Sequence, residues 1–216
     1  MVLPARTPTL LLYAGVAVLT VGCASPPQPT ANSGPDDPLV ASGVDREATP
    51  AAFSVCHGYG CASLHMIGLN DREAAELRAL FEPSAPSAAE ERKRVAQAVA
   101  LLEQAAARRL GTDADLPRTP YSMGDPAQLD CVDESINTST FLHLLDSQGW
   151  LRWHRVGDPA ERFRFMRFGR HYTAVLIETG PGDANRRYAV DSWFHANGVP
   201  AEVVALPVWR AGWDPD

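Results

Sequence analysis

The stretch HYTAVLIETGPGDANRRYAVDSW, from His171 to Trp193, has the pattern of a β-hairpin. Mostly apolar residues follow His171, the turn Gly-Pro-Gly-Asp comes at 180–183, and a second strand-like run covers 187–193. Turn residues between two such runs favour paired antiparallel strands. If the strands pair around this turn, we expect His171 and Asp191 to lie opposite each other.

The segment before the hairpin predicts a helix followed by more strands. A helix is expected from Cys131 to about Ser147, ended by Gly149, and strands are expected over 150–156 and 162–168. The expected packing residues of this helix are Ile136, Phe141, Leu144 and Leu145. A helix followed by antiparallel strands indicates an α+β domain, with a helix-borne cysteine packed on an antiparallel β-sheet.

Two further helices are predicted nearer the N-terminus. Residues 70–73 and 87–90 both have the spacing of a helix-capping box. Apolar stripes follow each of them, and Pro83 and Gly111 end the two runs. We interpret both as packing helices with solvated charged faces.

The first 50 residues predict an export signal and a tether. Residues 1–22 contain Arg6 and a short apolar run, typical of a signal peptide, and they end before Cys23 in a sequence that resembles a bacterial lipobox. This pattern predicts a lipidated Cys23; the alternative is an ordinary secretory signal. Residues 23–50 are rich in Pro, Ser, Asp and Gly and predict a flexible tether, which leaves 51–216 as a single domain.

Export determines how the close cysteine pair, Cys56 and Cys61, is interpreted. In an oxidising compartment two cysteines with glycines between them favour a disulfide. The rival interpretation is a metal site formed by Cys56, His57 and Cys61, although zinc usually takes four ligands. With the disulfide, His57 and His65 are expected to be surface or packing residues.

The net charge of −7, from 26 acidic and 19 basic residues, argues against a general nucleic-acid-binding protein. The chemistry is instead expected at three residues. Cys131 opens a helix, where the helix dipole stabilises a thiolate. His171 begins a strand and can act as the base, Asp191 can orient its imidazole, and Trp193 can shield the base from water.

The order and spacing of these residues resemble the transglutaminase-like and papain-like cysteine enzymes. The segment Asp130-Cys131-Val132-Asp133 stands at a helix start, His171 follows forty residues after Cys131, and Val190-Asp191 follows twenty residues later. Within that group the pattern is most similar to the bacterial transglutaminase-like cysteine proteinases, which clip large surface adhesins in the periplasm. The resemblance covers about residues 120–195.

This resemblance implies further site residues. In the adhesin-clipping enzymes calcium binds beside the nucleophile, which makes Asp130 and Asp133 candidate Ca²⁺ ligands. The alternative is that both cap the helix, with no metal and no cofactor needed for the chemistry. Carboxylates next to Cys131 would otherwise raise the thiol pKa. The backbone N–H of Cys131 is the natural oxyanion donor, and Gln128 is a second candidate.

We therefore expect an exported thiol hydrolase, most similar to a cysteine protease, that cleaves a protein or peptide substrate in the cell envelope through a thioester. It is expected to be lipid-anchored and to face the periplasm, or to be soluble there. A cell-wall peptidase, amidase or transamidase with the same triad is the second hypothesis. The third is a non-enzymatic envelope lipoprotein that binds a protein or glycan.

Overall fold

The computed structural model describes residues 1–2, 43–119, 125–163, 169–180 and 186–215. Within these ranges the chain forms an α+β fold of four helices and two antiparallel sheets. No helix in the described ranges is both long enough and apolar enough to cross a membrane. Residues 3–22 of the predicted signal peptide, Cys23 and most of the predicted tether lie outside the described residues.

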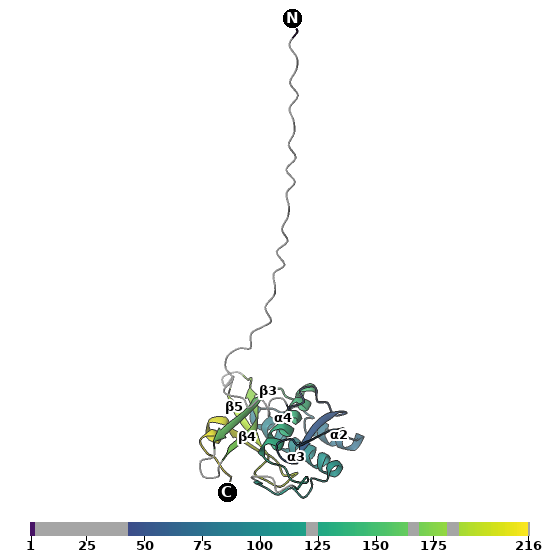
Figure 1. The fold of residues 1–216 in the computed structure, drawn as a ribbon, viewed down its shortest axis with the longest axis vertical. Helices are drawn as coiled ribbons and strands as arrows, with labels where there is room; N and C mark the ends of the chain where they lie inside the picture. Colours follow the sequence, from purple (N-terminus) through teal and green to yellow (C-terminus); the bar gives the residue numbers. More distant parts are fainter. Residues whose placement is uncertain (3–42, 120–124, 164–168, 181–185, 216) are drawn as a thin grey trace. The chain divides into compact units, whose positions relative to one another are not determined.

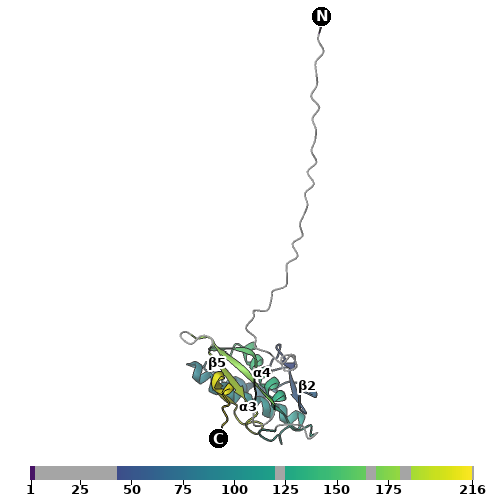
Figure 2. The same cartoon turned by 60° about the vertical axis from the view of Figure 1, so that its left-hand side comes forward.

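The central element is α4 (Cys131–Ser147), whose bounds match the prediction. It packs against both sheets and against α3 (Ala88–Leu110). Figure 1 shows α4 between the strands of the larger sheet and the N-terminal helices, and Figure 2 shows strands of the two sheets on opposite sides of it. Because α4 is enclosed in this way, nearly all of its residues from 133 to 145 are buried, polar ones included. An apolar stripe alone would not predict such burial.

The larger sheet has the order β3-β4-β5-β6, and all its pairs are antiparallel. Its strands are β3 (His154–Phe163), β4 (Arg170–Glu178), β5 (Arg187–Asp191) and β6 (Glu202–Ala205), and α5 (Leu206–Arg210) follows directly. The predicted hairpin is β4–β5 and is confirmed. Its apolar residues are buried because α4 covers one face of the sheet and α5 packs on β5 and β6.

The strand predicted over 150–156 begins later, at His154, and continues through Phe163 as one strand. A register shift between Gly157 and Ala160 interrupts its pairing with β4. A β-bulge of this kind leaves residues unpaired without ending the strand, so the sequence pattern breaks where the strand does not. Residues 164–168 of the other predicted strand lie outside the described residues.

The smaller sheet is a hairpin of β1 (Phe53–His57) and β2 (Ser63–Ile67), which the sequence analysis did not predict. Each strand has only five residues, and the turn between them is closed by the disulfide. Short runs flanked by cysteines and glycines have too little periodicity to indicate strands.

The two N-terminal helices, α2 (Asp71–Ala79) and α3, begin where predicted. Asn70 and Glu73 form a complete capping box, whereas Ser87 accepts the N–H of Glu90 as a simple cap. Gly111 ends α3 in the left-handed conformation, as expected.

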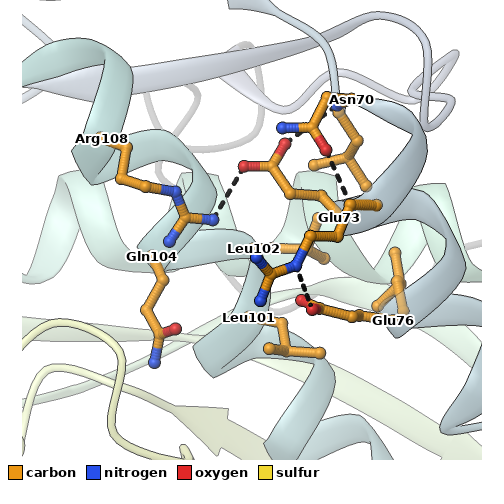
Figure 3. A pocket seen from close by; sticks show the side chains of 10 residues that line it. Asn70, Glu73, Glu76, Leu101, Leu102, Gln104 and Arg108 are labelled. Carbon is orange, nitrogen blue, oxygen red and sulfur yellow. Dashed lines mark hydrogen bonds and ion pairs between the residues drawn. The ribbon is translucent and has the colours of Figure 1, made fainter.

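A hollow of about 300 Å³ lies between α2 and α3. Figure 3 shows Arg108 and Gln104 of α3 facing Glu73 and Glu76 of α2 across it. Glu73 binds Arg109 at 2.6 Å and Arg108 at 2.8 Å, and the hydrogen bond from Arg109 is the main reason its pKa falls to about 2. The charges at this hollow therefore neutralise one another.

The packed domain includes residues that were assigned to the tether. Ala48 is fully buried in the main core, and Asp45 accepts the backbone N–H of Ser54 at 3.1 Å. Ser147, at the end of α4, donates its hydroxyl to the carbonyl of Ala48 at 3.0 Å. These contacts extend the packed part of the chain to the N-terminal side of the expected boundary at residue 51.

Candidate active site

The candidate base and its acid are in direct contact. Nε2 of His171 lies 2.8 Å from Oδ2 of Asp191, and both side chains are buried. Ala174 pairs with Val190, so the register puts Asp191 level with Thr173, and the contact with His171 runs diagonally between β4 and β5. The prediction that the hairpin joins these two residues is confirmed, although they are not directly opposite.

Three aromatic rings surround the imidazole. The ring centroids of Trp193, Phe194 and Trp209 lie 4.7, 5.6 and 5.5 Å from that of His171. Trp209, fully buried on α5, also donates its indole N–H to Oδ2 of Asp191 at 2.7 Å. The contact with Trp193 agrees with the prediction. Trp209 was missed, because it belongs to a separate element with no motif to connect it to the site.

The second ring nitrogen of His171, Nδ1, is buried and makes no hydrogen bond within the described residues. Because Nε2 faces a carboxylate, the proton of a neutral imidazole belongs on Nε2. Nδ1 then carries a free lone pair, which is the state that a general base requires.

Cys131 lies at the start of α4, beside β4, the strand that carries His171. Its Sγ is 3.7 Å from the carbonyl oxygen of Arg170, and the backbone N–H of Tyr172 also bonds to the sulfur. The sulfur therefore contacts the backbone on both sides of His171. It makes no hydrogen bond to the imidazole within the described residues, since Nδ1 has no partner and Nε2 binds Asp191.

Burial raises the pKa of the Cys131 thiol to about 12. The N–H of Tyr172 lowers the pKa and the charges of Asp130 and Asp191 raise it, so desolvation prevails. Desolvation therefore opposes the thiolate that the helix terminus was expected to stabilise, and the reactivity of Cys131 stays a prediction. The N-cap carboxylate of Asp130 offsets the positive end of the helix, and the partial burial of Cys131 favours the uncharged thiol.

The acidic residues that flank Cys131 hold the disulfide loop. Oδ1 of Asp130 accepts the N–H groups of Val132 and Asp133, and its Oδ2 accepts that of Gly60 at 3.1 Å. Oδ1 of Asp133 accepts the N–H of Cys61 at 2.7 Å, and its Oδ2 accepts those of Tyr59 and Asp130. The alternative of helix caps is therefore observed, together with a second role in binding the loop.

This loop has an unusual backbone. Gly58, Tyr59, Gly60 and Cys61 have φ values of 83°, 70°, 62° and 57°, so four successive residues are left-handed. Two of them are not glycine, and each such residue costs about 1–2 kcal/mol of conformational free energy. Successive N–H groups in such turns point inward and form a cradle for anions. Here the cradle receives the two carboxylates at the start of α4.

The Cys56–Cys61 disulfide is present, which confirms the prediction over the metal alternative. His57 stacks on His65 with 5.1 Å between the ring centroids, and its Nδ1 lies 2.8 Å from the carbonyl oxygen of Pro126. Both histidines thus have packing roles, as expected.

The carboxylate oxygens proposed as calcium ligands are engaged by backbone N–H groups, and Ca²⁺ binding at Asp130 and Asp133 stays a prediction. All four carboxylate oxygens of Asp130 and Asp133 accept backbone N–H groups, whereas Ca²⁺ takes six to eight oxygen ligands. In the described part of the chain, no group of three or more His, Cys, Asp or Glu side chains is arranged to hold a metal. Burial raises the pKa of Asp133 to about 6, and the N–H bonds of the loop oppose that rise.

Gln128 is buried and holds the preceding loop. Its Oε1 accepts the N–H of Leu116 at 3.0 Å, and its Nε2 donates to the carbonyl of Ala114 at 2.9 Å. These bonds give the side chain a structural role, and its part in an oxyanion hole stays a prediction.

A cluster of buried carboxyl groups next to Asp191 was not predicted. Ser192 donates its hydroxyl to Glu134 at 2.6 Å, and Glu134 in turn lies close enough to Glu103 and Asp115 to feel their charges. Burial raises the pKa of Glu103 and of Asp115 to about 7 each, and that of Glu134 well above its usual value. These residues come from α3, a loop and α4, so no local sequence pattern relates them.

No family model, curated protein or solved structure matches this chain.

Proposed function

We propose that this protein is an exported thiol hydrolase of the transglutaminase-like and papain-like class, most similar to a cysteine peptidase. The observation that carries the proposal is the orientation of the His171 ring. Its Nε2 is hydrogen-bonded to Asp191, and its buried Nδ1 has no hydrogen-bond partner among the described residues. An imidazole oriented by an acid, with the other nitrogen free, is the base of an acyl-transfer triad. The sulfur of Cys131, against the backbone next to His171, is the available nucleophile.

In the proposed reaction, Nδ1 of His171 takes the thiol proton while Sγ of Cys131 forms a bond to the acyl carbon. The backbone N–H of Cys131 stabilises the oxyanion. The imidazolium returns its proton to the leaving amine as the carbon–nitrogen bond breaks, which leaves a thioester. Water then attacks the thioester with His171 as the base, releasing the acid and restoring the thiol.

The raised pKa of the thiol favours base-assisted attack over a preformed ion pair. A thiol with a pKa of about 12 is uncharged at neutral pH, so the proton must leave during attack. Asp191 assists because its negative charge stabilises the imidazolium that forms. The surrounding rings of Trp193, Phe194 and Trp209 exclude water and strengthen that interaction.

The cellular part of the proposal rests on the sequence. The signal-like residues 1–22 and the sequence before Cys23, which resembles a lipobox, support export and lipid anchoring. The Cys56–Cys61 disulfide agrees with an oxidising compartment such as the periplasm. A protein or peptide of the cell envelope is then the substrate.

The test is the rate at which iodoacetamide alkylates Cys131, measured by mass spectrometry from pH 5 to 10. The wild type is expected to react near pH 7 at least about tenfold faster than the His171→Ala variant, because only the wild type has a base for the thiol proton. A His143→Ala variant is the control, since His143 is a half-buried residue of α4 outside this site.

The raised thiol pKa also favours a second function, a non-enzymatic lipoprotein that keeps the fold and binds a protein or glycan. In that case Cys131 is an inert packing residue. Slow alkylation that is unaffected by His171→Ala, and that increases only at strongly alkaline pH, would support this binding protein and reject the hydrolase.

A further inference from the structure

Two large apolar side chains on β2 are exposed to solvent near the candidate site. Leu64 is 57% exposed and Met66 is 63% exposed. Because they are two residues apart on a strand, they project from the same face of the hairpin. Large side chains exposed together in this way indicate a surface that another molecule covers.

The backbone of β2 is open on one side. Within the described residues it pairs with β1 alone. The opposite edge of the hairpin is closed, because Asn137 of α4 accepts the N–H of Cys56 at 2.7 Å and donates to its carbonyl at 2.8 Å. The open edge of β2 therefore presents N–H and C=O groups to a further strand. An extended peptide is the ligand that satisfies such groups, and side chains along the edge select its sequence.

The open strand is continuous with the surroundings of the candidate nucleophile. Leu64 pairs with Cys56, which packs in one cluster with Cys61, Cys131 and Tyr172. Leu64 is thus the strand partner of a residue that packs in the same cluster as Cys131.

A third exposed apolar side chain belongs to the larger sheet. Phe163, at the end of β3, is 72% exposed and pairs with Arg170, whose carbonyl contacts Sγ of Cys131. Exposed apolar side chains therefore occur on both sheets that carry neighbours of the candidate nucleophile.

We propose that β2 is the docking edge for the substrate of this protein. The occupant is an extended polypeptide segment with large apolar side chains at alternate positions, which adds a third strand to the β1–β2 sheet. Backbone bonds hold it extended, Leu64 and Met66 contact its apolar side chains, and the chain continues toward Cys131. This inference rests on the proposed function, because it names the substrate class of the same site.

The test measures binding to the purified Cys131→Ala protein, which cannot cleave its ligand. The probe is a fluorescein-labelled decapeptide of alternating Leu and Thr with a lysine at each end, and the readout is fluorescence anisotropy. Leu64→Asp and Met66→Asp are each expected to raise the Kd at least about tenfold, equivalent to about 1.4 kcal/mol. The control is Val208→Asp, which places the same charge at an exposed apolar residue of α5 and is expected to leave the Kd unchanged.

Two further peptides separate strand addition from adhesion to an apolar surface. In one, alternate residues are N-methylated, which removes the N–H donors of one edge and keeps the apolar side chains. In the other, Asn replaces every Leu. Both are expected to bind at least about tenfold more weakly than the parent peptide. If the N-methylated peptide binds as well as the parent, no strand is added and the proposal is overturned.

A second copy of the chain is the rival occupant of this edge. Sedimentation velocity of the wild type and of Met66→Asp tests it. A dimer that Met66→Asp converts to a monomer would assign the edge to self-association and overturn the proposal, whereas a monomer in both proteins supports a peptide ligand.

Failure of the docking edge and failure of the hydrolase give different results. Peptide binding that depends on Leu64, with no cleavage by the wild type, would keep the docking edge and reject the hydrolase. Cleavage of the same peptide with a KM unchanged in Leu64→Asp would keep the hydrolase and reject the docking edge.

Discussion

Trp209 and His171 bind the same oxygen atom of Asp191. The indole Nε1 lies 2.7 Å and the imidazole Nε2 lies 2.8 Å from Oδ2. The two donors come from α5 and from β4, so the carboxylate is fixed by two elements that are distant in sequence. A carboxylate held in this way has little freedom to turn away from the imidazole that it orients.

Trp209→Phe is expected to release Asp191 while it keeps most of the ring packing. The loss of one buried hydrogen bond to a charged group should lower the free energy of unfolding by about 1.5–3 kcal/mol, measured by urea denaturation. The pH profile of Cys131 alkylation should also shift, because Asp191 no longer holds His171 in one orientation. Trp150→Phe is the matched control, since Trp150 stacks on Phe81 away from the site. A Trp209→Phe protein with lower stability and an unchanged pH profile would give Trp209 a packing role only.

Removing the disulfide is expected to affect both stability and the reactivity of Cys131. The double variant Cys56→Ala/Cys61→Ala removes a crosslink that closes a short loop, worth about 2 kcal/mol by chain entropy. The same loop donates N–H groups to Asp130 and Asp133, so its loosening should free the start of α4 and change the alkylation rate. Thermal unfolding and alkylation at pH 7 measure the two effects. A large fall in Tm with an unchanged alkylation rate would show that the loop and the nucleophile are independent.

Asp133→Ala should be among the more destabilising substitutions on α4. It removes the acceptor of the N–H groups of Tyr59 and Cys61, and we expect a loss of about 2–4 kcal/mol in the free energy of unfolding. Asp146→Ala, at the exposed end of the same helix, should cost less than about 0.5 kcal/mol. If Ca²⁺ raises the Tm of the wild type but not of Asp133→Asn, the carboxylate binds metal and our assignment of its oxygens to backbone N–H groups is wrong.

The buried carboxyl cluster should make the protein less stable as the pH rises. Glu103 and Asp115 have folded pKa values of about 7, above those of the unfolded chain, so the folded state binds more protons between about pH 4 and pH 7. Stability is therefore highest below the unfolded pKa and falls until the folded pKa is passed. For Glu103 alone we expect a loss of roughly 2–4 kcal/mol across this window.

Urea denaturation at pH 4.5, 6 and 8 measures this dependence. Glu103→Gln removes the titrating group, so the free energy of unfolding should fall less between pH 4.5 and pH 8. Glu90→Gln, at a more exposed position of the same helix, should leave the pH dependence of stability unchanged. If the stability of the Glu103→Gln protein falls with rising pH as steeply as that of the wild type, Glu103 is not the cause of the pH dependence.

The local elements of this fold could be predicted from the sequence because their signals are local. The capping pattern and apolar spacing at 87–111 mark the ends of α3, and the turn at 180–183 between two strand-like runs indicates the β4–β5 hairpin. The hairpin in turn brings His171 near Asp191, because strand pairing converts sequence distance from the turn into spatial position. The Cys56–Cys61 disulfide was predictable from spacing and from the expectation of export.

By itself, therefore, the sequence determined the three longer helices, the main hairpin, the disulfide and the approach of His171 to Asp191. Only the tertiary structure decided that Trp209 binds Asp191, that the disulfide loop binds the carboxylates beside Cys131, and that desolvation raises the pKa of the thiol. The physical reason is that hydrogen bonds between distant elements, and the desolvation that sets a pKa, depend on which surfaces pack together. Helix caps and turns depend only on near neighbours in the chain.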